Sequence, residues 1–153
     1  MFVEEAGTIS ATQTFSKYAQ KGKYKMSQIL EAYPPNVFAS ECPSRQVLSH
    51  VTSRWGVLAL VALLDGTQRF SALRRRIEGV SEKMLAQTLQ ILEADGFVDR
   101  KSLPVVPPHV EYSLTTTGVE IALQVKGIVE WIEQNLPRVS EPPKWPLRPI
   151  ENT

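Results

Sequence analysis

A short amphipathic helix with clear signals at both ends constrains the fold of this chain more than any other segment. Ser81 is a favourable N-cap residue, and Glu82 places a negative charge in the first turn, where the helix dipole favours it. Asp95-Gly96 then ends the helix, because glycine readily adopts the left-handed conformation of a C-terminal cap. The apolar residues between these signals recur at helical spacing and form one stripe: Leu85, Leu89 and Leu92. One face of this helix is therefore expected in a core and the other is left free.

A second, shorter helix is expected directly before it. Ser71 can cap a helix over residues 72–77, and Glu78-Gly79 closes that helix. Residues 68–70 can pair as a single edge strand. Two short helices joined by a tight turn that contains glycine are typical of a helix-turn-helix.

Two strands are expected after these helices. They cover residues 97–101 and 110–114 and are separated by the stiff, proline-rich loop 104–108. The strands would form a hairpin whose loop is too long for a tight turn. A two-stranded ribbon that follows a helix-turn-helix indicates a winged helix-turn-helix.

Long helices are expected on both sides of this unit. Residues 44–64 carry one stripe and end at Asp65-Gly66; the stripe is Val47, Val51, Trp55, Leu58 and Ala62. Residues 115–136 carry another stripe, formed by Ile121, Val125, Ile128 and Ile132. The order of elements predicts an α+β fold that is mostly α, with long first and last helices that form a dimer interface.

Composition divides the chain into three parts. Residues 1–40 have weak periodicity and are expected to form a partly flexible N-terminal arm. Residues 41–136 hold the periodic apolar positions and are expected to form the winged helix-turn-helix domain for DNA binding and dimerisation. Residues 137–153 are rich in proline and are expected to form an extended tail.

The residue inventory excludes several classes of function. One cysteine and two histidines provide no zinc-ligand spacing, and no glycine-rich phosphate loop occurs, so neither an enzyme nor a cofactor or metal site is expected. No apolar run is long enough for a membrane span, and a cytoplasmic, nucleoid-associated protein is expected. The net charge of +1 is no evidence for or against binding to nucleic acid. DNA binding must therefore be argued from the placement of basic residues.

The free face of the helix that begins at Ser81 is the first candidate DNA surface. In a helix-turn-helix the second helix enters the major groove and its N-terminal residues contact base edges. Lys83 can bind phosphate or guanine, and Gln87 can pair with adenine, with Ser81 and Met84 on the same surface. The alternative is an ordinary solvated face, since exposed lysine and glutamine are common on any helix.

Basic residues around the motif form the second candidate surface. Their guanidinium and ammonium groups suit phosphate oxygens. Salt bridges with Glu78, Glu82 or Glu93 are the alternative role for the arginines, and a structural role in the loop is the alternative for the histidine. The expected phosphate-binding set is Arg69, Arg74, Arg75, Arg76, Arg100 and Lys101, and the wider set of expected DNA-binding residues also includes Ser71 and His109.

The apolar arc of the last helix is wider than one core contact requires, which favours a homodimer. The spare face is expected to contain Val125, Val129, Ile132 and Leu136, and the first helix is its expected neighbour through Val47, Leu48 and Val51. Two recognition helices related by a twofold axis would then meet successive major grooves roughly 34 Å apart, as on a palindromic operator in double-stranded DNA.

Between residues 41 and 136 the chain resembles the HxlR-type regulators of bacteria. The matching stretches are Cys42-Pro43, Arg54-Trp55, QRFSAL at 68–73, GVSEKML at 79–85, LEADGFV at 92–98 and VPPHVEYSLT at 106–115, with Gly118 and Trp131. Many relatives have lysine before the tryptophan, where this chain has Arg54; the charge is kept.

The resemblance implies a winged helix-turn-helix dimer that binds an inverted-repeat operator and represses or activates nearby genes. It assigns the recognition helix to residues 81–95 and the wing to residues 98–114. Some members of the family sense oxidants or electrophiles through a cysteine near the start of the first helix. Cys42 occupies that position, beside a helix N-terminus that lowers a thiol pKa; a capping role without signalling is the alternative.

Two rival functions remain open from the sequence. A small-molecule ligand bound between the long helices could be the signal instead of a thiol reaction. Alternatively, the winged domain could serve protein–protein contact without DNA binding, although the arginine cluster and Lys83 argue against that alternative.

Overall fold

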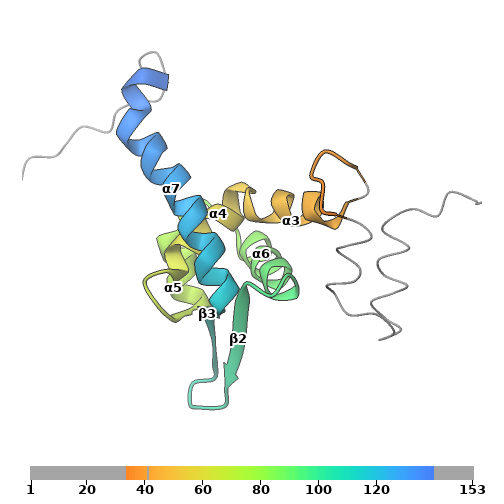
Figure 1. The fold of residues 1–153 in the computed structure, drawn as a ribbon. Helices are drawn as coiled ribbons and strands as arrows, with labels where there is room; N and C mark the ends of the chain where they lie inside the picture. The colour runs from red at the N-terminus through yellow and green to blue at the C-terminus, as the bar shows by residue number, and fades with distance from the viewer. Residues whose placement is uncertain (1–33, 41, 140–153) are drawn as a thin grey trace, which may run out of the picture.

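The computed structural model describes residues 34–40 and 42–139, which form five helices and one three-stranded antiparallel sheet (Figure 1). This confirms the predicted class, α+β and mostly α. The elements in chain order are α3 (Pro43–Val51), α4 (Arg54–Leu63), β1 (Gln68–Arg69), α5 (Phe70–Arg76), α6 (Glu82–Ala94), β2 (Val98–Leu103), β3 (His109–Leu114) and α7 (Thr116–Val139).

The prediction of one continuous helix over residues 44–64 is wrong, because this segment forms two helices. α3 ends at Val51 and α4 begins at Arg54, with Ser53 as an extended N-cap between them. The Ser53 hydroxyl accepts a bond from the Gly56 amide at 3.1 Å and donates to the His50 carbonyl at 2.8 Å. Local bonds of this kind compete with the helical ladder, so the polar pair Thr52-Ser53 interrupts the helix despite its continuous apolar stripe.

The sheet has the strand order β1-β3-β2, so the short strand before α5 joins the hairpin. Gln68 and Arg100 both lie opposite Tyr112, one from each side of β3. The ribbon of β2 and β3 extends away from the helices, and its loop forms the far end of the molecule on that side (Figure 1). The strands begin and end within a few residues of the positions predicted.

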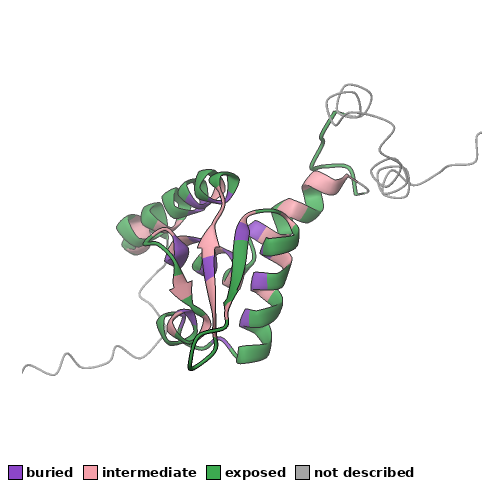
Figure 2. Cartoon of the chain, turned by 90° about the horizontal axis from the view of Figure 1, so that it is seen from below, coloured by how far each residue is buried: buried purple, intermediate pink, exposed green. Residues whose placement is uncertain are grey.

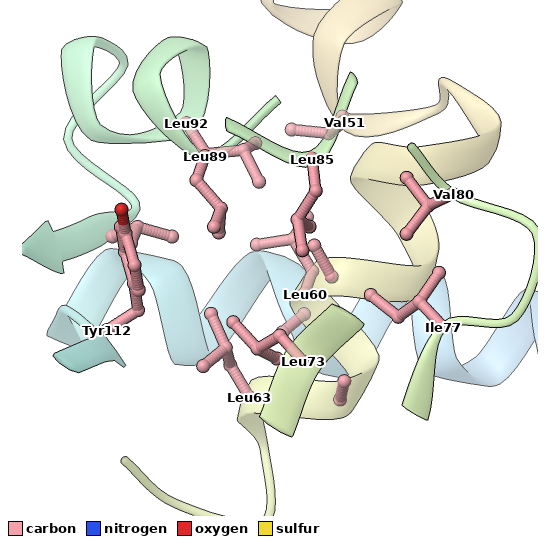
Figure 3. Packing of buried hydrophobic residues seen from close by; sticks show 14 of the residues in the cluster. Val51, Leu60, Leu63, Leu73, Ile77, Val80, Leu85, Leu89, Leu92 and Tyr112 are labelled. Atoms are coloured by element: carbon pink, nitrogen blue, oxygen red, sulfur yellow. The ribbon is translucent and has the colours of Figure 1, made fainter. Parts of the chain in front are cut away.

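The core lies where α4, α5, α6, the first half of α7 and the sheet meet. The side chains of one cluster interlock at this point (Figure 3), and the largest fully buried members are Leu60, Leu63, Leu73, Leu85, Leu89, Leu92 and Val98. Tyr112 brings the sheet into the same cluster, with 8% of its surface exposed. The predicted stripe of α6 is therefore the side of the helix that packs.

α3 and the second half of α7 lie at the edge of this core. In Figure 2 most of α3 is exposed or half-buried, and Val51 is its one buried residue. α7 buries only Gly118, Ala122 and Val125, all in its first half. The long helices thus extend beyond the core that the helix-turn-helix builds.

α7 ends later than predicted. The helix was expected to stop at Leu136, but it continues through Pro137 to Val139. Proline lacks the amide that would bond to the carbonyl four residues earlier, so one ladder bond is absent, and the helix continues for only two residues beyond it. The side chain of Arg138 donates to the Asn135 amide oxygen at 3.0 Å in the same turn.

The predictions for residues 1–33 and for the tail beyond 139 lie outside the described residues. Within residues 34–40 and 42–139, no helix is long and apolar enough to cross a membrane. In the same part of the chain, no group of three or more histidine, cysteine, aspartate or glutamate side chains is placed to hold a metal ion.

Candidate nucleic-acid interface

The turn between α5 and α6 fixes the angle of the helix-turn-helix. Ile77 and Val80 are both buried, with 4% and 6% of their surfaces exposed, and they hold the two sides of the turn in the core. Gly79 between them has φ +83°, a conformation that side chains with a Cβ rarely adopt. The Ser81 hydroxyl then accepts the Met84 amide at 3.1 Å, which confirms Ser81 as the N-cap of α6.

The side of α6 opposite the leucine stripe is exposed. It presents Lys83, Gln87 and Gln90, and Met84 keeps 41% of its surface exposed among them. The Thr88 hydroxyl bonds back to the Met84 carbonyl at 2.8 Å, so it belongs to the helix itself. Of the four residues predicted to face base edges, Lys83, Met84 and Gln87 are exposed in the N-terminal half of α6, whereas the Ser81 hydroxyl caps the helix.

The arginines of α5 divide into bound and free side chains. Arg76 donates to the Ala62 carbonyl in the last turn of α4 at 3.2 Å and forms an ion pair with Asp65, which follows that helix. Arg74 lies 3.6 Å from Glu82, one of the partners considered from the sequence. Arg75 is exposed and makes no ion pair with any residue that the structure describes. Arg75 is therefore the arginine of α5 most available to a phosphate.

Charged residues face one another on the outer side of the ribbon. Glu111 lies opposite Arg69 in β1 and opposite Lys101 in β2. His109 Nε2 lies 3.1 Å from the Glu111 carboxylate, and Nδ1 lies 3.3 Å from the Pro107 carbonyl. These bonds favour the structural interpretation of His109, whose side chain is only 16% exposed.

A hollow separates α6 from the ribbon. Its volume is about 390 Å³, and it is lined by Ala86, Gln90, Glu93, Arg100 and Tyr112. Arg100 belongs to β2 and Gln90 to α6, so the hollow marks the place where α6 and the ribbon are adjacent.

An unpredicted contact joins α3 to the end of α6. His50 Nδ1 lies 2.7 Å from Asp95 Oδ2, and the two side chains are 23% and 15% exposed. Asp95 is the C-cap of α6 and His50 lies in the last turn of α3. The two residues are 45 positions apart, and no local spacing signal in the sequence pairs them.

Cys42 is the N-cap residue of α3 and is half-buried. Its Sγ lies 3.0 Å from the Ser44 hydroxyl and accepts the Asn36 amide at 3.3 Å. The hydrogen bond with Ser44, followed by that from the Asn36 backbone, holds the pKa of the Cys42 thiol below its ordinary value. The thiolate is the reactive form of cysteine, so this arrangement favours reaction with oxidants and electrophiles.

The predicted dimer residues fall into two groups. Val51 and Val125 are each only 3% exposed and belong to the core of a single chain. Leu48 and Ile132 are exposed at 45% and 43%, and the rest of the set, Val47, Val129 and Leu136, is half-buried. The free apolar surface of α7 also includes residues that the predicted set omitted, namely Leu123, Ile128 and Trp131, exposed at 53%, 56% and 54%.

Comparison with known proteins gives consistent matches over this region. The family model of HxlR-like helix-turn-helix proteins matches residues 50–140. The helix-turn-helix-type transcriptional regulator YtfH of Escherichia coli (strain K12) is 66% identical over 104 residues, which are 68% of this chain and 82% of that protein. These relatives are transcriptional regulators, in agreement with the expectation of a regulator and not an enzyme.

Comparison with solved structures also finds transcriptional regulators. The transcriptional regulator YtfH of Salmonella typhimurium has a TM-score of 0.67 and 67% identity, over 69% of this chain and 94% of that chain. The redox regulator HypR in its oxidized form has a TM-score of 0.57 and 37% identity, over 61% of this chain and 97% of that chain.

Proposed function

The chain belongs to the HxlR-like helix-turn-helix family of DNA-binding transcriptional regulators, and from that premise we propose that it binds an inverted-repeat operator as a homodimer. The observation that carries this proposal is the free face of α6. Lys83, Met84 and Gln87 are exposed together on the helix that a helix-turn-helix inserts into the major groove. Arg75 and Lys101 lie on the adjoining elements, where they can hold phosphates on either side of that groove.

The roles within this surface differ. Lys83 and Gln87 carry donors and acceptors that suit base edges, so they would set sequence preference. Arg75, Arg100 and Lys101 would hold phosphates without reading sequence. Arg76 is already bonded to Ala62 and Asp65, and its contribution to DNA binding is expected to be small.

The homodimer is supported by apolar surface that a single chain leaves uncovered. On α7 this surface contains Ile128, Trp131 and Ile132, and on α3 it contains Leu48. Phe38, immediately before α3, is 91% exposed. Exposed apolar side chains that gather on one helix, as Ile128, Trp131 and Ile132 do on α7, are typical of protein interfaces. A twofold axis beside these helices would set two α6 helices on one face, which an inverted repeat requires.

We further propose that Cys42 makes DNA binding responsive to thiol oxidation. The proposal is supported by the bonds from Ser44 and Asn36 that favour the thiolate, and by similarity to the redox regulator HypR. In the reaction, Cys42 and a second thiol, from the partner chain or a small molecule, form a disulfide. Two electrons and two protons pass to the oxidant; diamide, for example, becomes the corresponding hydrazine.

Operator binding is tested by selecting duplexes that bind the full-length protein. The reduced chain is incubated with a library of random duplexes, and bound duplexes are amplified and sequenced over several rounds. The proposal predicts enrichment of one inverted repeat with half-sites about 10 base pairs apart, one helical turn. Failure to enrich any sequence, with a correctly folded dimer in solution, would contradict operator binding.

The thiol proposal is tested on the selected duplex with fluorescence anisotropy. Diamide should change the affinity of the wild-type protein and leave Cys42→Ser unaffected. Ser44→Ala removes the largest cause of the lowered pKa, so the pKa of Cys42 should rise. The rate of alkylation by iodoacetamide should then reach half its maximum at a higher pH than in the wild-type protein. An identical pH profile would show that Ser44 does not favour the thiolate.

A further inference from the structure

One directional contact holds α3 against the end of α6. It joins His50 Nδ1 to Asp95 Oδ2 at 2.7 Å, and the two side chains are 23% and 15% exposed. An ionised carboxylate only accepts hydrogen bonds, so the Nδ1–H of His50 is the donor. Hydrogen bonds to a charged group are among the stronger ones in proteins. Neither residue belongs to the proposed DNA surface or to the proposed dimer surface, so the contact needs another explanation.

The place of Asp95 indicates that stability is not the main role of this contact. Asp95 is the C-cap of α6, where the helix dipole disfavours a negative charge. His50 lies in the last turn of α3, so the pair brings the C-terminal ends of two helices together. A half-buried ion pair is weak evidence for stability, and its best-attested use is to select one arrangement of the elements that it joins.

The rest of the inner side of α3 is apolar. Val51 is buried, and Val47 packs against the core cluster. Apolar contacts are non-directional, so alone they permit several positions of α3 along its neighbours. The break at Thr52-Ser53 also separates α3 from the helical ladder of α4. The directional bond of His50 therefore selects one position of α3 relative to α6.

The same end of α6 is bonded to the start of α7. The hydroxyls of Thr115 and Thr117 donate to the Gly96 carbonyl at 2.7 and 3.1 Å. The Thr115 amide donates to the Phe97 carbonyl at 3.0 Å. α3 and α7 carry the apolar surface proposed for the dimer, so both helices meet α6 at its C-terminal end. A displacement of that end is passed along the helix to the exposed residues at its other end.

We propose that the bond between His50 and Asp95 fixes the spacing of the two α6 helices in the dimer, and that both residues are positioning residues for operator choice. The inference rests on the proposed binding of a homodimer to an inverted repeat. Neither residue contacts DNA. With the bond in place, α3 sets each α6 at one distance from the twofold axis, and the dimer accepts one spacing of half-sites. Without the bond the dimer tolerates neighbouring spacings, whereas preference within each half-site stays with Lys83 and Gln87.

The test uses the inverted repeat selected by the full-length wild-type protein, with constant half-sites and a spacer changed by one or two base pairs. One base pair moves a half-site by about 3.4 Å and turns it by about a tenth of a helical turn. Anisotropy should show that this change weakens wild-type binding about ten-fold or more, because the α6 helices are held at one spacing. In His50→Ala the same change should cost about three-fold or less, while affinity for a single half-site stays at the wild-type value.

A conservative variant separates the bond from the bulk of the histidine. The amide nitrogen of asparagine is attached to Cγ, as Nδ1 is in histidine, so His50→Asn keeps a donor near the same place. His50→Asn should restore the steep spacing profile. Asp95→Ala should flatten the profile as His50→Ala does, and the double variant should be no flatter than either, because the two changes remove one shared contact.

The matched control is Asp65→Ala. It removes the aspartate of the ion pair with Arg76, which involves neither α3 nor α7, and should leave the spacing profile as steep as in the wild type.

Three results would overturn the inference and leave operator binding intact. They are a wild-type spacing profile in His50→Ala, a flat profile in His50→Asn, and a loss of half-site affinity in His50→Ala equal to its loss on the inverted repeat. A wild-type protein that selects no duplex would overturn operator binding as well.

Discussion

α6 and α7 are both amphipathic helices of the same small domain, yet their outer faces differ in chemistry. α6 buries Leu85, Leu89 and Leu92 and turns a polar face with Lys83 and Gln87 outward. α7 buries small residues near its start and leaves Ile128, Trp131 and Ile132 exposed on its second half. The outer face of α6 is compatible with water or DNA, whereas that of α7 needs a protein surface.

The difference shows that burial on one side does not define the function of a helix. Both stripes are visible in the sequence, but only the free side distinguishes the helix proposed to read DNA from the helix proposed to hold the dimer. Each of the following predictions alters α6, α7 or the neighbouring α5, and each uses a matched change on α7 as its control.

The largest effect is expected where α7 is anchored to the domain. A Cβ at Gly118 would lie 1.9 Å from the Phe97 carbonyl oxygen, in the turn between α6 and β2. Gly118→Ala should lower the free energy of unfolding by about 3 kcal/mol, because backbone atoms must move. Urea denaturation measures this change. Gly127→Ala, which meets no atom within 4 Å, is the control and should be neutral or stabilising.

The next effect concerns the outer face of α7. Ile132→Ser removes an exposed apolar side chain, 43% exposed, from the proposed interface. The dimer dissociation constant should rise about ten-fold or more, while the helical content of the chain is unchanged. Sedimentation equilibrium measures the constant, with Val119→Ser at the anchored end of α7 as the control. An unaltered dimer would place the interface elsewhere.

A smaller effect is expected on the outer face of α6. Gln87→Ala should reduce discrimination between the best operator and a single-base variant by about 1–2 kcal/mol, because a bidentate contact to adenine is lost. Competition binding on the two duplexes measures the discrimination. Gln124→Ala makes the same change on the exposed side of α7 and should leave discrimination intact.

The smallest effect is expected from the loss of a single proposed phosphate contact. Arg75→Ala should weaken all duplexes alike and reduce the slope of log affinity against log salt by about 1. Lys126→Ala removes an exposed cation from α7, where Lys126 pairs with Glu130 at 3.2 Å, and should not change the slope. An unchanged slope in Arg75→Ala would exclude a phosphate contact at this residue.

The parts of the fold that depend on local signals could be predicted from the sequence. The cap at Ser81, the leucine stripe of α6 and the glycine turn act over a few residues, and all are present as expected. The break at Ser53 was missed because hydrogen bonds of side chains to the backbone outweighed a continuous apolar stripe. The boundaries of the strands shifted because pairing with β3 extends β2 to Leu103.

The candidate site divides in the same way. The exposed face of α6 follows from helical periodicity and was predictable. The pairs His50–Asp95 and Arg76–Asp65 join separate elements, and their formation depends on how the helices pack in space. The burial of Val51 and Val125 was also not predictable, because a stripe wider than one contact does not show which of its residues face the core.

The most direct test of the central claim, that α6 reads DNA and α7 holds the dimer, is a titration of the selected duplex with the full-length protein. Anisotropy and sedimentation of the same samples give affinity and stoichiometry for an inverted repeat and for a single half-site. Two chains are expected on the inverted repeat, bound about a hundred-fold or more tightly than on the half-site. One chain per duplex, with equal affinity for both duplexes, would contradict the central claim.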